Sequence, residues 1–217
     1  MKSDREFLAG EYNKRKAEIK RRLGEFRSLG GRPDRDIFGE LCFCLFTANA
    51  NAVLCDRAIR ELKDTGLLLK GGAREVRPKI RGKVRFHNKK ALFLVGARRL
   101  FSSGPGGRLD IKSRIEPGRV QDTREWLVEN VKGLGYKEAS HFLRNIGLGD
   151  DIAILDRHIL KNLKRYGVIQ RIPSSLGSRK TYLEIEEKMR RFAGDIRIPM
   201  PELDLLFWSI QTGFVFK

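Results

Sequence analysis

Helical spacing of apolar residues recurs along most of this chain, and runs that alternate between apolar and polar residues, as strands do, are hard to find. Residues that start helices and glycines that end them separate the helical patterns. The segment IFGELCFCLFTANA, residues 37–50, is almost entirely apolar, so we expect it to form a central buried helix. The sequence therefore predicts an all-α protein.

Capping residues and glycines predict several helix ends. The first amphipathic pattern covers residues 4–23 and is expected to end at Gly24. Asn51 is suited to the N-cap of the helix after the central one, and Ser178 to the N-cap of a long C-terminal helix. The stretch 102–122, rich in Gly, Ser and Pro, is expected to be the clearest loop of the protein.

The charge of the chain points to an anionic partner. Its 45 Lys and Arg residues against 27 Asp and Glu residues give a net charge of +18, far more than solubility requires. Such a charge suits nucleic acid or an anionic membrane surface, and a generic basic protein such as a ribosome-associated factor is the alternative. Because no apolar run approaches the length of a membrane span, we expect a cytoplasmic protein with no membrane partner.

The cysteines do not suggest a metal site. Cys42 and Cys44 are two residues apart in a predicted helix, so their side chains diverge, and Cys55 completes an odd number. We expect all three to be small buried hydrophobic residues in a reducing compartment. The sequence predicts no catalytic metal and no cofactor.

A Gly-Leu-Gly turn lies between two helical patterns, within residues 123–147. Gly133 and Gly135 let the backbone turn tightly and approach a ligand, and the small residue Ala139 suits a close helix crossing. The second helix begins at this turn, so its unpaired N–H groups and the positive end of its dipole favour a DNA phosphate. The pattern predicts a helix-hairpin-helix motif, although an ordinary helical hairpin with a glycine cap has the same spacing.

The segments GLGYKEASHFLRNIG and AILDRHIL resemble the type 2, archaeal-type 8-oxoguanine DNA glycosylase/AP lyases of the helix-hairpin-helix superfamily. The similarity extends to FCLFTANA, RFHNKKA, DLLFWSI and the terminal lysine. The resemblance implies a bifunctional repair enzyme that flips out and excises 8-oxoguanine from duplex DNA and then cleaves the strand by β-elimination. Its partners would be double-stranded DNA containing 8-oxoguanine or abasic sites.

The family's two catalytic residues correspond to Lys137 and Asp156. Lys137 would attack C1′ of the deoxyribose and form a Schiff base, and its place at a helix N-terminus disfavours the ammonium form. The carboxylate of Asp156 would stabilise the positive charge that develops on the sugar and help deprotonate the amine. Asp156 is also placed to cap the helix that follows, and the resemblance implies both uses.

The resemblance also implies residues that bind the flipped base and the DNA backbone. Trp208 would stack on the base, although a core tryptophan on an apolar helix is the alternative, and Phe86 is a second candidate for the pocket. The terminal carboxylate of Lys217 would accept hydrogen bonds from the guanine edge. His158 would contact a phosphate. The carbonyl groups of three hairpin residues would bind a monovalent cation: Glu129, Val131 and Leu134.

We expect two helical subdomains, one formed by residues 1–36 with 148–217 and the other, a helical barrel, by residues 37–147. The hairpin would lie at the cleft between them. The expected protein is a monomer of the prokaryotic cytoplasm, associated with the nucleoid. Two alternatives remain: a non-catalytic hairpin module that only binds nucleic acid, and a glycosylase for another oxidised base.

Overall fold

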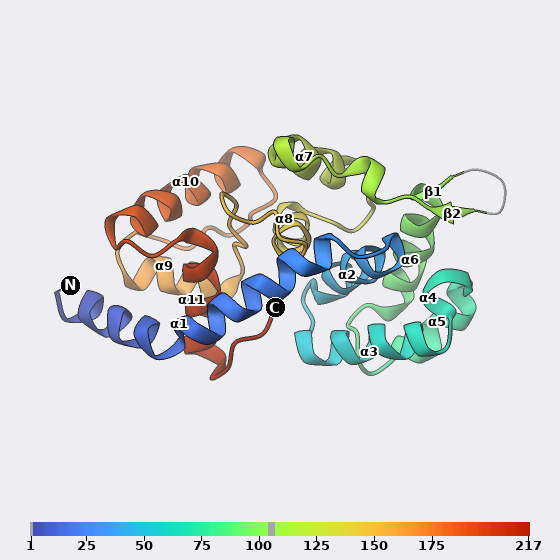
Figure 1. Cartoon of the computed structure of the whole chain (residues 1–217), viewed down its shortest axis with the longest axis horizontal. Helices are drawn as coiled ribbons and strands as arrows, with labels where there is room; N and C mark the ends of the chain where they lie inside the picture. The colour runs from blue at the N-terminus through green and yellow to red at the C-terminus, as the bar shows by residue number, and fades with distance from the viewer. Residues whose placement is uncertain (1, 104–106) are drawn as a thin grey trace. The chain divides into compact units, whose positions relative to one another are not determined.

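The computed structural model describes residues 2–103 and 107–217, which form helices and one very short two-stranded sheet (Figure 1). The predicted all-α class is therefore confirmed. The α-helices are α1 Lys2–Gly30, α2 Asp34–Thr47, α3 Ala52–Asp64, α4 Leu67–Lys70, α5 Ala73–Ile80, α6 His87–Leu100, α7 Val120–Asn130, α8 Tyr136–Asn145, α9 Arg157–Arg165, α10 Arg179–Asp195 and α11 Met200–Thr212.

The chain divides into two compact units. The first comprises Met1–Ser28 and Leu143–Lys217, and the second comprises Leu29–Phe142. Both α1 and α8 pass from one unit into the other. The expected domain boundaries after residues 36 and 147 stay a prediction.

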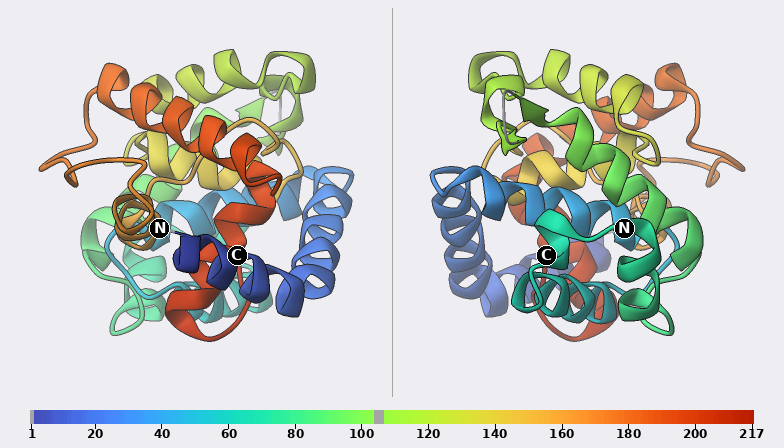
Figure 2. Two further views of the ribbon diagram at one scale, coloured as in Figure 1. Left: turned by 90° about the vertical axis from the view of Figure 1, so that its left-hand side faces the viewer. Right: turned by 90° about the vertical axis from the view of Figure 1, so that its right-hand side faces the viewer.

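The second unit is built around α2. Every residue of α2 from Ile37 to Thr47 is buried, as the apolar run predicts, and α2 contacts α3 and α6. Helices α4 and α5 complete this group by packing on α3 and α6, as Figure 1 and the right-hand view of Figure 2 show. The three cysteines lie inside this unit with no exposed surface, so the prediction that they are buried is confirmed.

The first unit is built around α11, whose residues from Leu203 to Phe207 are all buried. Helices α9 and α10 both pack on it (Figures 1 and 2). The N-terminal part of α1 is attached by a buried hydrogen bond of 2.6 Å from the hydroxyl of Tyr12 to Glu202 Oε2. Burial and this carboxylate raise the pKa of Tyr12 far above its usual value.

Two predicted features differ from the structure. Helix α1 continues through Gly24. Leu23 and Phe26 are buried on either side of this glycine, and their packing outweighs the low helix propensity of glycine. The predicted loop 102–122 contains β1 Ser102–Ser103, antiparallel to β2 Arg108–Leu109, then 3-10 turns at Lys112–Arg114 and Pro117–Arg119 and the start of α7. Residues 104–106 of that loop lie outside the described residues.

Candidate active site and DNA-binding hairpin

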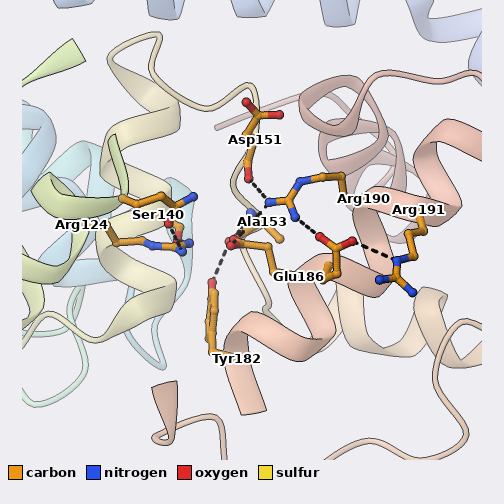
Figure 3. A network of polar contacts seen from close by, with 10 residues as sticks. Arg124, Ser140, Asp151, Ala153, Tyr182, Glu186, Arg190 and Arg191 are labelled. Carbon is orange, nitrogen blue, oxygen red and sulfur yellow. Dashed lines mark hydrogen bonds and ion pairs between the residues drawn. The ribbon is translucent and has the colours of Figure 1, made fainter. Parts of the chain in front are cut away.

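Helices α7 and α8 form the predicted hairpin around the turn Val131–Gly135. The turn is closed by the N–H of Leu134, which donates to the carbonyl of Val131 at 3.0 Å. In the interior, Arg124 of α7 donates to the hydroxyl of Ser140 of α8 at 3.1 Å, a contact drawn in Figure 3. The first N–H groups of α8 have no acceptor within the helix, so the turn presents donors where the sequence predicts a phosphate site.

The two glycines of the turn have different roles. Gly133 has a φ of +95°, and a Cβ there would lie 2.4 Å from Cδ2 of Phe93 on α6. A Cβ on Gly135 would meet only Oε2 of Glu138, at 3.3 Å. The space into which a side chain at position 133 would point is therefore filled by the protein itself, and the approach of this backbone to a DNA phosphate stays a prediction.

Substitution of Gly133 by Ala should lower the free energy of unfolding by about 2 to 4 kcal/mol, because the side chain adds backbone strain and a clash with Phe93. Gly135→Ala is the matched control, since the Glu138 carboxylate can rotate away, and it should cost less than about 1 kcal/mol. Chemical denaturation of the two variants compares them. Equal losses of stability in the two variants would contradict the conclusion that the fold requires glycine at position 133.

Lys137 lies in the first turn of α8, directly after the Gly-Leu-Gly turn. Its Nζ is 3.4 Å from Oε1 of Glu138, and its side chain keeps 22% of its surface exposed. The other carboxylate oxygen of Glu138 accepts from the N–H of Gly135 at 3.3 Å. The predicted nucleophile therefore has an ionic partner in the structure, which the sequence analysis did not anticipate.

A buried lysine on α6 belongs to the same unit. Lys90 is 4% exposed, and its Nζ donates to the carbonyls of Phe46 and Ala48 at 2.6 Å each. The thiol of Cys55 donates to the same Phe46 carbonyl at 3.3 Å. Burial lowers the pKa of Lys90 to about 8, and the positive charge of Lys137 acts in the same direction.

Asp156 is the N-cap of α9, as the sequence predicts. Its Oδ1 accepts from the N–H groups of His158 and Ile159 at 2.7 and 2.8 Å. Both bonds use one oxygen, and among the described residues Oδ2 accepts no hydrogen bond. The helix thus fixes the direction of the carboxylate and leaves one oxygen available for chemistry.

Helix α10 holds the segment that leads to Asp156 (Figure 3). The hydroxyl of Tyr182 donates to the carbonyl of Ala153 at 2.7 Å and accepts from the N–H of Leu155 at 3.2 Å. Glu186 Oε2 accepts from the N–H of Ala153 at 2.7 Å, and Arg190 donates to the carbonyl of Asp151 at 2.6 Å. Side chains on α10 thus form hydrogen bonds with the backbone of the segment just before Asp156.

Tyr182→Phe should lower the free energy of unfolding by about 1 to 3 kcal/mol, because it leaves the Ala153 carbonyl and the Leu155 N–H unpaired and buried. Tyr166→Phe is a matched control in the same unit. Its hydroxyl is buried and has no hydrogen-bond partner among the described residues, so its removal should change stability by less than about 0.5 kcal/mol. Thermal denaturation of both variants measures the difference, and a similar loss in both would argue against the pairing role of Tyr182.

His158 follows Asp156 in the first turn of α9 and is half-buried. Its Nε2 accepts from Nε of Arg157 at 3.3 Å, and its Nδ1 has no partner among the described residues. Burial lowers the pKa of His158, although the Asp156 carboxylate opposes that shift. Because Nδ1 is itself buried, the contact of His158 with a phosphate stays a prediction.

The expected base-binding residues are partly exposed. Trp208 lies on α11, T-shaped against Phe214 with ring centroids 5.3 Å apart and stacked with Phe216 at 6.2 Å, both in the C-terminal segment that ends at Lys217. In the other unit, Phe86 has a φ of +57° and is 54% exposed, with the guanidinium of Arg85 4.9 Å from the centre of its ring. Trp208 is thus not fully enclosed in the core.

The α9 and α11 helices that carry Asp156 and Trp208 pack on each other, and Asn162 of α9 donates to the Phe207 carbonyl at 3.4 Å. No set of three or more His, Cys, Asp and Glu side chains in the described part of the chain could hold a metal ion. Of the hairpin carbonyls expected to bind a monovalent cation, that of Val131 already accepts from Leu134. The cation site stays a prediction.

Lys90 and Glu138 are the charged residues of this region that the sequence analysis missed. Lys90 shares one helical face with Leu94 and Ala97, which are buried, so the phase of the apolar residues could have predicted its burial. Glu138 follows Gly135 by three residues, the spacing of a side chain that caps a helix N-terminus.

An all-α fold with a lysine in the first turn after a Gly-hydrophobic-Gly hairpin, and an aspartate capping a later helix, defines the class of helix-hairpin-helix DNA glycosylases. Residues 19–198 match the family model described as 8-oxoguanine DNA glycosylase. The chain belongs to the 8-oxoguanine DNA glycosylase family.

Relatives from bacteria and archaea agree with this membership. An 8-oxoguanine DNA glycosylase/AP lyase of Fusobacterium nucleatum is 42% identical over 208 residues, 95% of this chain and 94% of that protein. One from Methanocaldococcus jannaschii is 43% identical over 199 residues, 92% of this chain and 91% of that protein.

Solved structures show the same fold. The crystal structure of the Thermotoga maritima 8-oxoguanine DNA glycosylase has a TM-score of 0.86 at 37% identity and covers all of both chains. The Methanocaldococcus jannaschii 8-oxoguanine glycosylase/lyase, in complex with a 15mer DNA containing 8-oxoguanine, has a TM-score of 0.86 at 38% identity, covering 97% of this chain and 100% of that one.

Proposed function

We propose that this protein excises 8-oxoguanine from DNA and cleaves the strand at the resulting site, with Lys137 as the nucleophile. The observation that carries the proposal is the position of Lys137, partly exposed in the first turn of α8 beside a hairpin of the kind that binds phosphate. The family membership favours an enzyme over a non-catalytic hairpin module and 8-oxoguanine over other oxidised bases.

The chemistry begins when neutral Nζ of Lys137 attacks C1′ of the deoxyribose. A bond forms between Nζ and C1′, and the glycosidic bond breaks, so the base leaves with the bonding pair and takes up a proton. Loss of the proton on nitrogen and opening of the sugar ring give the Schiff base. Removal of a proton from C2′ then expels the 3′ phosphate oxygen and cleaves the strand, and water releases the lysine.

Asp156 supplies the negative charge that this route needs. As positive charge develops on the sugar, a carboxylate nearby lowers the barrier, and it can also take the proton from the attacking amine. The two backbone N–H groups that bind Oδ1 hold the carboxylate in one orientation. Asp156 therefore acts as cap and catalytic group together.

The remaining site residues bind the DNA. Trp208 and Phe86 offer aromatic faces to the flipped base, and the terminal carboxylate of Lys217 accepts from its edge. The hairpin at Gly133 and Gly135 and the imidazole of His158 bind phosphates. The net charge of +18 makes binding fall steeply with salt concentration.

Other parts of the proposal concern the setting in which the enzyme works. The partner is DNA, and we propose that abasic sites are also substrates and that the protein acts as a monomer. In the part of the chain that the structure describes, no helix combines the length and the apolar character needed to cross a bilayer. The cytoplasmic, nucleoid-associated location stays a prediction.

Borohydride trapping tests the proposal. The native protein is incubated with a duplex carrying one 8-oxoguanine, then with sodium borohydride, which reduces a Schiff base to a stable covalent adduct. We expect an adduct with this duplex and none with the same duplex carrying guanine, and peptide mapping should place the DNA on Lys137. No adduct, or an adduct on another lysine, would overturn the mechanism.

A further inference from the structure

Three aromatic rings are grouped around the C-terminal end of α11. The ring of Trp208 is T-shaped against Phe214, with an angle of 86° between the ring planes and 5.3 Å between the centroids. It is stacked with Phe216 at 6.2 Å and an angle of 28°. The two phenylalanine rings are 5.9 Å apart, so each ring of the group contacts both others. The indole proposed to stack on the flipped base thus has two aromatic neighbours from one segment of the same unit.

The backbone reverses its direction directly after α11, as Figures 1 and 2 show. Gly213 ends the helix with a φ of +90°, in the left-handed region that favours glycine. The hydroxyl of Thr212 lies within hydrogen-bond distance of two carbonyl groups, that of Trp208 at 2.9 Å and that of Phe214 at 3.2 Å. This turn therefore brings residues 214–216 back beside the last turns of α11.

The returning segment alternates between buried and exposed side chains. Val215 is 5% exposed, whereas Phe214 is 45% exposed. Such alternation is typical of an extended chain, in which neighbouring side chains point to opposite sides and Phe214 and Phe216 share one side. Val215 thus anchors the segment in the core, while the rings on the other side contact Trp208.

The orientation of the indole matters for stacking on a base. A partly exposed tryptophan can turn about two side-chain torsions, and binding a base in one orientation costs the entropy of the others. A neighbour that is nearly parallel to the ring and a second one at right angles to it together restrict both torsions. The indole is therefore oriented before the base arrives.

We propose that Phe216, assisted by Phe214, is a positioning residue for base recognition: it holds the ring of Trp208 in the orientation in which a flipped oxidised purine stacks on it. This inference rests on the proposed role of Trp208. Neither phenylalanine contacts the reacting atoms in this account, since both act through the indole. An aromatic group that only stabilises the end of α11 would instead affect every activity of the protein equally.

The test compares two reactions under single-turnover conditions: excision of 8-oxoguanine from a duplex, and cleavage of the same duplex carrying a preformed abasic site. Only the first reaction offers a base to Trp208. Trp208→Ala should lower excision by about 10- to 100-fold, and Phe216→Ala should lower it by about three- to tenfold. Phe216→Ala should change cleavage at the abasic site by less than about twofold, because no base is stacked there.

Two control variants accompany this comparison. Phe216→Tyr keeps the aromatic ring, so its excision rate should stay within about twofold of the native rate. Phe7→Ala removes a ring of the same unit that is 44% exposed and contacts the guanidinium of Arg165 at 5.3 Å. The described ring contacts of Trp208 do not include Phe7, so this variant should also excise 8-oxoguanine at the native rate.

Two further measurements show whether Phe216 acts through the indole. In a Trp208→Ala background, Phe216→Ala should change excision by less than about twofold, since the ring that it orients is gone. The chain has two tryptophans, so Trp126→Phe leaves Trp208 as the only one. In that background and without DNA, Phe216→Ala should increase the quenching of Trp208 fluorescence by acrylamide.

The possible outcomes are distinct. Native excision by Phe216→Ala, an equal loss in both reactions, unchanged quenching, or the same loss with and without Trp208 would overturn the inference. Native excision by Trp208→Ala would overturn the role of Trp208 and this inference together, and would leave the lysine mechanism standing. If the native protein excised no 8-oxoguanine, the proposed function itself would be wrong, and the positioning role would be lost with it.

Discussion

Lys137→Gln should abolish the covalent adduct with 8-oxoguanine DNA and lower base excision and strand cleavage by about 10³-fold or more. Glutamine is close to lysine in length and keeps a polar end, but its amide cannot form a Schiff base. Lys137 contributes one ion pair with Glu138 to the described structure, and that pair is partly exposed, so folding should be little affected. Single-turnover assays with a labelled duplex measure both steps.

Lys132→Gln is the matched control for this experiment. Lys132 is an exposed lysine in the same hairpin turn, so its loss removes one positive charge from the DNA-binding surface without touching the nucleophile. It should weaken DNA binding modestly and preserve the adduct at saturating protein. If Lys137→Gln kept the adduct, or if both variants lost it, the assignment of the nucleophile would be wrong.

Asp156→Asn should lower the rate of base excision by about 10²- to 10³-fold while the protein stays folded. Asparagine keeps an oxygen that can accept from the N–H groups of His158 and Ile159, so the cap of α9 is largely preserved. What is lost is the negative charge. The measurements are the single-turnover excision rate and the melting temperature of the same preparation.

Asp156→Ala separates the two roles of this residue. It removes the charge and the cap together, so it should match Asp156→Asn in rate but lose a further ~1 kcal/mol of stability. An asparagine variant with nearly native activity would show that Asp156 is only a cap. The affinity for DNA should hardly fall in either variant, because removing an anion does not weaken binding to a polyanion.

Local signals in the sequence predict much of the fold. The apolar run 37–50 predicts the buried α2, and Asn51, Asp156 and Ser178 each cap the helix expected of them. Each of these signals acts over a few residues and needs no knowledge of distant contacts. The predicted end of α1 at Gly24 is wrong because it depends on distant contacts. Phe26 is buried against residues remote in sequence, and this packing continues the helix past Gly24.

In the candidate site, too, some features follow from local sequence signals and others depend on contacts between distant residues. The positions of Lys137 and Asp156 at helix starts follow from the hairpin glycines and the capping pattern, and their catalytic roles come from the resemblance. The ion pair of Lys137 with Glu138 and the two hydrogen bonds from Lys90 to the end of α2 depend on side-chain directions and on contacts between α2 and α6, which no local pattern encodes. The use of Gly133 to admit Phe93 is likewise visible only in three dimensions.

The enclosed ammonium of Lys90 also affects the stability of the protein in alkaline solution. Its pKa is about 8 in the folded protein against an ordinary value of 10.5, so between these pH values the unfolded chain binds more protons than the native one. Raising the pH through this range therefore favours the native state through Lys90, and the full penalty for enclosing the charge applies below it. At neutral pH the enclosed charge of Lys90 therefore makes the native state less stable than it is in alkaline solution.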